Sequence, residues 1–338
     1  MSRRLGPGTV EFTGDIRIES YAAIVGKKEK EGPLGDYFEH FEEDTTLGKP
    51  SWEKSETELQ RRTFALALDR RSLSPSNIDM LFGGDLLNQC IASGYAFRET
   101  GLPFLGLYGA CSTMALSLAM ASAFCEGGAA DRAAAITSSH FCAAERQYRF
   151  PLEYGGFRAP ASQWTVTGSG CLIVSRGGKS PIRVRRASFG AVRDLGLTDM
   201  NNMGCAMAPA ACDTLTRYFK DTGTSPKDYG AVVTGDLGKI GSEVFCDLCS
   251  REGYEVSNHL DCGKLIYDTE SQKVGSGGSG CGCSASVLAA YFLPQLERGE
   301  MKSLLFMATG ALMSPTSFQQ GESIPGIAHL VFLESEKN

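Results

Sequence analysis

One cysteine lies where the sequence could make a thiol reactive. Cys111 follows an apolar, strand-like stretch at residues 103–108 and a tight Gly109-Ala110 turn. The apolar stretch at residues 114–125, rich in small side chains, is typical of a buried helix. The pattern predicts a thiol at the first turn of that helix, where the helix dipole lowers a thiol pKa. Such a thiol could act as a nucleophile; the alternative is a small cysteine packed in an α/β core.

Two of the four histidines are candidates for a place beside this cysteine. His140 comes shortly after a predicted buried strand at residues 133–138, which places it at a pocket mouth at the end of that strand. His259 lies in a run, residues 259–262, that an internal repeat brings opposite the cysteine turn. For each histidine the alternative is an imidazole packed in the core.

Two further patterns match ligand motifs only in part. The glycines of residues 275–280 have the spacing of a dinucleotide fingerprint, but no ribose-binding acid follows on a later strand. Cys246 and Cys249 would share a face of a helix, yet no second pair stands at zinc-site spacing. We therefore expect no nucleotide cofactor and no metal.

The composition is that of a globular protein with room for two core-bearing units. The chain has 338 residues, of which 42% are hydrophobic and 21% charged. A net charge of −6 without a basic block argues against nucleic acid as a partner. The first seven residues lack the apolar core of a signal peptide, and the longest apolar run is too short to cross a bilayer. We expect cytoplasmic synthesis, with the twelve cysteines as reduced thiols.

The sequence contains an internal repeat. Residues 80–86 and 231–237 share one pattern, an apolar strand that ends in Gly-Asp-Leu. The same shift carries Cys111 to Cys262, close to His259. Two further pairs of segments correspond in character: residues 132–137 with 302–309, and residues 170–175 with 328–333.

Short apolar strands alternate with helical patterns in both halves. This alternation is typical of largely parallel, buried sheets. The sequence therefore predicts an α/β protein with two duplicated halves, residues 1–178 and 179–338, the first carrying Cys111 and the second His259.

These features together resemble the thiolase superfamily and, within it, the type III β-ketoacyl synthases. Cys111 matches the position of the family nucleophile, and residues 280–286 resemble the family motif Gly-Asn-Thr-Ser-Ala-Ala-Ser. Residues 167–171 resemble the family segment Gly-Asp-Gly-Ala-Gly. The resemblance implies a thiolase-like duplicated five-layer αβαβα sandwich, with His259 as the histidine supplied by the second half.

One position departs from the synthase pattern. Cys281 stands where the synthases have an asparagine. Decarboxylative condensation needs neutral hydrogen-bond donors aimed at the developing enolate oxygen, and a thiol is a weak donor. The replacement argues against condensing activity, even with Cys111 and His259 present.

A more specific resemblance is to the stage V sporulation protein AD family of spore-forming bacteria. It is carried by residues 84–89, 107–113, 138–151, 163–170 and 261–268. It implies a protein that binds dipicolinic acid (pyridine-2,6-dicarboxylate), or its calcium chelate, during uptake into the developing spore. It also implies a place in sporulation and spore germination, peripheral to the spore inner membrane and in complex with integral membrane subunits.

A ligand with two carboxylates needs fixed cations or convergent hydrogen-bond donors. Arginines flank the aromatic-rich loop at residues 147–157, and Lys264 follows Cys262, although each of these charges could simply be solvated. The predicted ligand-binding residues are Cys111, His140, Arg149, Arg158, His259, Lys264 and Cys281.

Thiolase-like proteins pair as twofold dimers, so we also expect a homodimer in which the stretch at residues 103–108 lies at the contact. For function, the first hypothesis is a dipicolinate-binding protein that keeps an old active-site pocket for binding. The alternative is an acyltransferase of the β-ketoacyl synthase III type that forms a thioester on Cys111, and a purely structural subunit is a third possibility. The replacement at Cys281 favours binding over catalysis.

Overall fold

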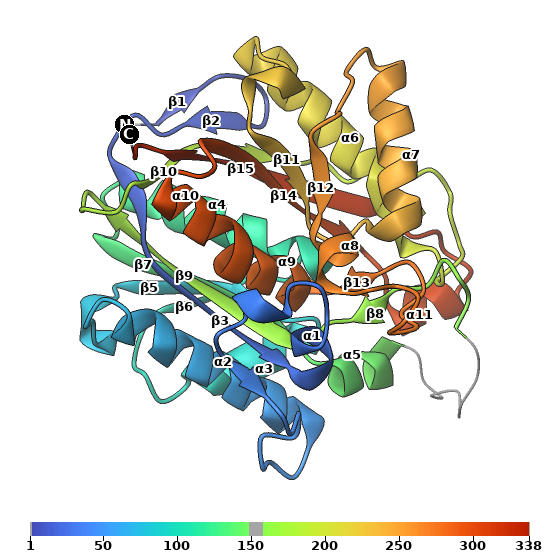
Figure 1. The fold of residues 1–338 in the computed structure, drawn as a ribbon, viewed down its shortest axis with the longest axis horizontal. Helices are drawn as coiled ribbons and strands as arrows, with labels where there is room; N and C mark the ends of the chain where they lie inside the picture. The colour runs from blue at the N-terminus through green and yellow to red at the C-terminus, as the bar shows by residue number, and fades with distance from the viewer. Residues whose placement is uncertain (1, 149–157, 338) are drawn as a thin grey trace.

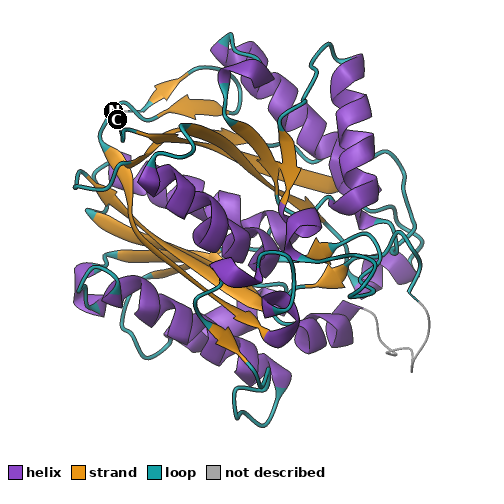
Figure 2. Ribbon diagram, in the orientation of Figure 1, coloured by secondary structure: helices purple, strands orange, loops and turns teal. Residues whose placement is uncertain are grey.

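The protein has five alternating layers of helices and sheet. The structure is a computed structural model that describes residues 2–148 and 158–337. Figure 1 shows helices below, between and above two groups of strands. Figure 2 shows the same alternation by secondary structure. This arrangement confirms the predicted thiolase-like αβαβα sandwich.

The first half of the chain builds one group of five strands. They are β3 (Ile16–Gly26), β5 (Met80–Gly84), β6 (Phe104–Gly106), β7 (Arg132–Ser139) and β9 (Gly168–Arg176). Their spatial order is β3-β9-β7-β5-β6, in which β5, β6 and β7 are parallel and β9 is antiparallel to both neighbours. Helices α2 (Trp52–Asp69) and α3 (Ile91–Phe97) lie on the outer face, and α4 (Thr113–Glu126) lies on the inner face.

The second half repeats this arrangement strand for strand. Its strands are β10 (Ile182–Phe189), β11 (Ala231–Thr234), β12 (His259–Asp261), β14 (Ser303–Ala311) and β15 (Gly326–Ser335), in the order β10-β15-β14-β11-β12. Helices α6 (Met203–Thr222) and α7 (Gly238–Arg251) cover the outer face. The middle layer holds α9 (Cys281–Val287), η6 (Leu288–Phe292) and α10 (Leu293–Arg298) beside α4. Each predicted pair of repeated strand segments takes matching places in this order.

Shorter elements complete the chain. They are β1 (Arg3–Arg4), β2 (Thr9–Glu11), α1 (Lys27–Lys30), η1 (Gly35–Tyr37), β4 (Phe41–Glu42), η2 (Pro75–Asn77), η3 (Asn88–Cys90), η4 (Ala110–Ser112), α5 (Phe141–Tyr148), β8 (Trp164–Thr165), η5 (Pro226–Asp228), α8 (Cys262–Ile266), β13 (Gly278–Ser279) and α11 (Pro315–Gln319). Strands β8 and β13 pair with each other and bring the two halves together beside α5. No helix of residues 2–148 and 158–337 is long and apolar enough to cross a membrane.

The middle layer explains why α4 is apolar on every side. This helix contacts β7 and β9 of one half and β14 and β15 of the other, so most of its surface is buried, and only Leu116, Met120, Ala123 and Phe124 are half-buried. Met114, Ala115 and Leu118 are fully buried there. A helix that is enclosed in this way needs small or apolar side chains all round, as the sequence of α4 has. The enclosure holds the start of α4, and therefore Cys111, in a fixed place.

Helix α9 packs equally closely against β9, at Gly170. A Cβ atom at Gly170 would lie 2.4 Å from the carbonyl oxygen and 2.8 Å from the Cβ of Ala285. We expect Gly170→Ala to lower the free energy of unfolding by about 2 kcal/mol or more, because backbone must move to relieve the overlap. The measurement is urea unfolding followed by circular dichroism.

Gly94 on α3 is the matched control, because a Cβ atom there would meet nothing within 4 Å. Gly94→Ala should raise the free energy of unfolding by about 0.5 to 1 kcal/mol through helix propensity alone. Equal effects of the two substitutions would contradict the close packing of α9 on β9.

Candidate functional site

Cys111 lies at the predicted turn between a strand and a helix. Strand β6 ends at Gly106, and η4 carries Cys111 directly into α4. The turn is sharp, since Ala110 has a left-handed φ of 51°. Gly310 of β14 closes on it: a Cβ atom at that glycine would lie 2.6 Å from the Gly109 carbonyl oxygen. A strand of the second half therefore fixes the position of the thiol.

A buried carboxyl group stands behind the thiol. The Cys111 Sγ lies 3.8 Å from the Ser279 Oγ, and Ser279 donates a hydrogen bond of 3.0 Å to an oxygen of Asp236. The same Asp236 oxygen accepts the Gly280 N–H at 3.0 Å, and its other oxygen accepts the Thr309 hydroxyl at 2.7 Å. Three elements of the second half thus converge on Asp236, which follows β11.

The electrostatics of this site correct the expectation of an activated thiol. Burial, followed by the negative charge of Asp236, raises the pKa of the Cys111 thiol well above its ordinary value. Burial also raises the pKa of Asp236. Desolvation and a nearby carboxylate outweigh the helix dipole, because the thiol is buried and the nearby carboxyl group of Asp236 is negative when ionised. Cys111 is therefore a neutral thiol at neutral pH.

Cys281 packs beside Cys111 at the start of α9. Both thiols belong to one apolar cluster with Leu86 and Ala144. The Cys281 Sγ donates to the Ser138 carbonyl oxygen at 2.9 Å, and burial raises the pKa of Cys281 well above its usual range. The structure thus brings these two predicted residues together, with Cys281 turned toward the end of β7.

A small cavity opens at Cys111. Its volume of about 50 Å³ has room for a few water molecules. The lining residues come from both halves: Leu86, Ala110, Cys111, Ala144, Glu145, Tyr148, Thr165, Met203, Met207, Ser279, Ala311 and Met313. Three of them are methionines, whose flexible thioether side chains can adapt to a ligand.

His259 does not share this cavity, which corrects the expected pairing with Cys111. Within the described residues it contacts Cys246 instead, with 3.6 Å between Sγ and Nδ1. The Thr234 hydroxyl donates to Asp261 at 2.6 Å and lies 2.8 Å from the His259 Nε2. The threonine therefore accepts the imidazole N–H, and the ring is held between β11 and α7.

The register of the strands explains this difference. His259 pairs with Val232 of β11, just as Phe104 pairs with Leu81 of β5. His259 is therefore the counterpart of a strand residue and not of the cysteine turn. The second half inserts α8 and a further segment after β12, so the structural counterpart of Cys111 at the start of a middle-layer helix is Cys281.

The other predicted residues are dispersed. His140 is 1% exposed, its Nε2 lies 2.9 Å from the Thr45 carbonyl oxygen, and its Nδ1 accepts the Ala143 N–H at 3.4 Å. Its imidazole therefore accepts a backbone N–H at the start of α5, and it does not line the cavity. Lys264 is exposed on α8, away from the cavity lining. Arg149 lies outside the described residues.

Arg158 is the predicted cation that lies beside the cavity. It forms an ion pair of 3.0 Å with Glu145, which lines the cavity. Its guanidinium group also lies 4.7 Å from the ring centroid of Trp164, and Trp164 stacks on Phe141 with centroids 4.1 Å apart. Lys28 approaches the same Trp164 ring at 4.5 Å. Of these groups only Arg158 is linked to the cavity, through Glu145; Trp164, Phe141 and Lys28 form a cluster on the other side of Arg158 and do not line it.

Sequence reasoning missed Asp236, Ser279 and Lys28 as site residues. The signal for Asp236 was present in the Gly-Asp-Leu that ends both repeated strands. Its counterpart Asp85 is also a buried acceptor, taking the Ser93 N–H at 2.8 Å. No group of three or more metal-ligating side chains occurs in the described part of the chain.

Comparison with known proteins gives consistent results. The family model described as stage V sporulation protein AD (SpoVAD) matches residues 6–334. The stage V sporulation protein AD of Bacillus subtilis (strain 168) is 44% identical over 330 residues, which cover 97% of this chain and 97% of that protein.

Solved structures share the fold at low identity. A variant of Xanthomonas campestris OleA matches with a TM-score of 0.62 and 12% identity over 96% of this chain and 99% of that one. The 3-oxoacyl-[acyl-carrier-protein] synthase III of Aquifex aeolicus VF5 matches with a TM-score of 0.55 and 11% identity over 94% and 99%. These likenesses concern the fold alone.

The environment of His259 predicts a pH dependence of stability. Burial lowers its pKa to about 4, below the value of about 6.5 in an unfolded chain. The unfolded state then binds the proton more strongly, so stability is complete above pH 6.5 and falls as the pH drops toward 4, by about 3 kcal/mol at most. His329, with a pKa also lowered to about 4 by burial, acts in the same direction.

We expect His259→Gln to remove part of the loss of stability between pH 7 and pH 4.5, because His140 and His329, whose pKa values burial also lowers, retain their share. Urea unfolding of both proteins at the two pH values measures this difference. An unchanged slope in the variant would contradict a buried, neutral His259.

Proposed function

This chain belongs to the stage V sporulation protein AD family, and we propose that it binds dipicolinic acid, or its calcium chelate, beside Cys111. In this proposal it serves dipicolinate uptake into the developing spore and later spore germination. It works at the periphery of the spore inner membrane, in a complex whose integral membrane subunits are other chains.

The state of the thiol supports binding over catalysis. A nucleophilic cysteine needs a lowered pKa or an adjacent base. Cys111 has a raised pKa, and its polar neighbours are a serine hydroxyl and a carboxyl group rather than an imidazole. Cys281, in place of an amide donor, leaves the site without strong support for an enolate oxygen.

The position of Arg158 beside the cavity is the main support for the proposal. A planar guanidinium group matches a carboxylate in geometry and charge. Arg158 is held beside the cavity by Glu145, and Lys28 lies on the same Trp164 ring. The stacked rings of Trp164 and Phe141 hold the guanidinium group of Arg158 from its other side. One carboxylate of the ligand would meet Arg158 while the ring enters the cavity as the methionine side chains shift.

We expect dipicolinate to bind the wild-type protein with an affinity that salt weakens, because charge pairing contributes to it. Arg158→Gln should weaken binding about tenfold or more through the loss of a charged hydrogen bond. Isothermal titration calorimetry measures both effects. Arg146→Gln is the matched control, since Arg146 on α5 pairs with Glu53 of α2 and not with a cavity residue.

The acyltransferase alternative has its own readout. Incubation with acetyl-, malonyl- and longer acyl-CoA, followed by mass spectrometry, should leave Cys111 unmodified because its thiol is neutral. Stoichiometric acylation of Cys111 without dipicolinate binding would overturn the proposal in favour of the enzyme. Equal affinities of the Arg158 and Arg146 variants would place the ligand elsewhere.

We also propose a homodimer formed at the β6 edge. Strand β6 ends its sheet, and three large apolar side chains near it are exposed: Ile91 at 39%, Tyr95 at 51% and Tyr108 at 50%. An unpaired strand edge beside apolar side chains is typically covered by another chain. A twofold contact between two copies of this surface would bury both.

Sedimentation at micromolar concentration should therefore show a dimer, and the double variant Ile91→Lys with Tyr95→Lys should be monomeric, since two buried charges would face their copies. Leu195→Lys is the control, because Leu195 is 75% exposed on a different part of the molecule. A monomeric wild-type protein would contradict the dimer.

A further inference from the structure

Strand β3 has a free edge along part of its length. On one side it pairs with β9 from Ile16 to Val25. On the other side β10 pairs with it only at Arg17, and β4 only at Val25 and Gly26. Across residues 18–24 no second strand pairs with β3 within the described part of the chain. The sheet therefore has a gap between β10 and β4.

The backbone groups that face this gap can be assigned. The Val25 N–H donates outward to the His40 carbonyl oxygen at 3.3 Å, whereas the Gly26 N–H donates toward β9, to the Thr167 carbonyl oxygen at 2.8 Å. Backbone groups alternate along a strand, so the N–H and C=O of Ala23 and Tyr21 point outward with those of Val25. These are the pairing groups of an edge strand.

A cavity of about 290 Å³ lies at this edge. Its walls come from α2 on one face of the sheet and from η6 and α10 on the other, so the cavity occupies the level of the sheet itself. Small side chains dominate the part nearest the strand: Ala22, Ala23, Ala289 and Ala290. The space is placed where the next strand of the sheet would lie.

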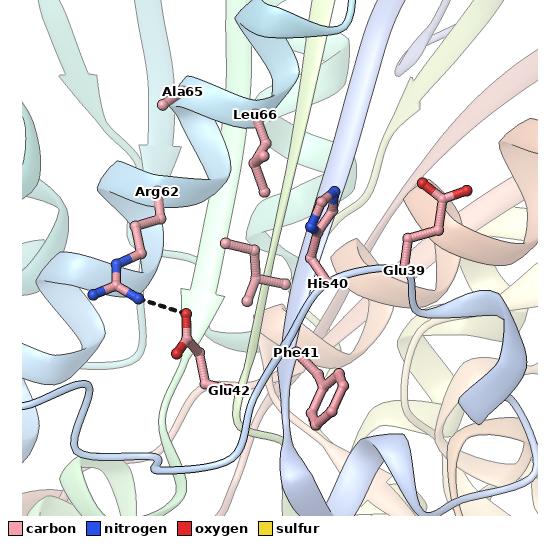
Figure 3. A pocket seen from close by; sticks show the side chains of 8 residues that line it. Glu39, His40, Phe41, Glu42, Arg62, Ala65 and Leu66 are labelled. Carbon is pink, nitrogen blue, oxygen red and sulfur yellow. Dashed lines mark hydrogen bonds and ion pairs between the residues drawn. The ribbon is translucent and has the colours of Figure 1, made fainter.

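A second groove, of about 400 Å³, continues this cavity along Ile24. Figure 3 shows it between α2, which contributes Arg62, Ala65 and Leu66, and the segment at residues 39–42. The cavity and the groove share Glu39, His40 and Leu66 in their linings. The cavity and the groove together form one continuous depression along the unpaired part of β3.

The rim of the gap is acidic. Glu42 pairs with Arg62, and Glu297 pairs with Arg70. Glu39 and Asp69 are exposed at the rim, and no ion pair engages either of them among residues 2–148 and 158–337. Two carboxylates without a cationic partner favour a positively charged ligand at this surface.

We propose that the free edge of β3 binds an extended, basic segment of another protein by strand addition. The segment would pair its backbone with the outward groups of Tyr21 and Ala23 and place small or β-branched side chains against the alanines. Its Lys or Arg side chains would reach Glu39 and Asp69. The dipicolinate site is built from other elements, so this proposal stands or fails independently of it.

The test uses the full chain and a fluorescein-labelled peptide, acetyl-Lys-Val-Lys-Val-Lys-amide, in fluorescence anisotropy. We expect saturable binding with a dissociation constant below about 1 mM. The same peptide with every residue N-methylated should bind about tenfold more weakly or worse, because it lacks the backbone donors of a strand. Equal binding of the methylated peptide, or no saturable binding, would overturn the proposal.

Two variants test where the peptide binds, and a third is the control for net charge. Glu39→Lys with Asp69→Lys should weaken peptide binding about tenfold, whereas Glu243→Lys with Glu322→Lys makes the same change of net charge elsewhere and should not. Ala23→Pro removes one outward N–H and should weaken binding, with circular dichroism to check the fold. Equal affinities of the two charge variants would overturn the proposal, and so would a change of oligomeric state in the first, since β3 would then pair with a second copy.

Amide hydrogen exchange gives a readout that needs no variant. The Ala23 and Tyr21 amides should exchange faster than those of Ala22 and Ile24, which face β9, and the peptide should slow them. Equal protection of both pairs in the free protein would contradict an open edge.

Discussion

The buried carboxyl group of Asp236 holds the centre of the molecule together. It accepts the Thr309 hydroxyl from β14, the Ser279 hydroxyl from β13 and the Gly280 N–H just before α9. A buried acceptor with these partners fixes the elements that supply them, because each unmade hydrogen bond would leave a polar group without water. The start of α9 is thereby set against the start of α4, which carries Cys111. The geometry of the cavity follows from this contact.

The same interaction decides the chemistry of the cavity. Cys111 keeps the turn that presents a nucleophile at the start of a middle-layer helix. Burial and a carboxyl group nearby hold its proton on the sulfur. The pocket therefore combines an unreactive thiol with a nearby cation, Arg158, which pairs with the lining residue Glu145. Such a combination suits the recognition of an aromatic anion better than the formation of a thioester.

The two duplicated halves also have edge strands, whose unpaired backbone N–H and C=O groups need hydrogen-bond partners. Among residues 2–148 and 158–337, each half ends in a strand with one unpaired side, at β6 and at β12, and β3 is open between its contacts with β10 and β4. Unpaired backbone groups at such edges bind water or another strand. Exposed apolar side chains near β6 suit a second copy of the chain, while the acidic rim at β3 suits a basic segment. The need of unpaired backbone groups for hydrogen-bond partners thus accounts for both proposed contact surfaces.

The sequence by itself determined the fold class, the repeated strands and the turn that carries Cys111, because buried strands and enclosed helices leave local patterns of apolar and small residues. It could not place His259, since the insertion of α8 after β12 changes the register of the repeat without changing its local pattern. It could not show that Asp236 meets Cys111 either. That contact joins opposite halves of the chain, and only the packing of α9 against α4 brings a carboxyl group to the thiol and reverses the expected direction of its pKa.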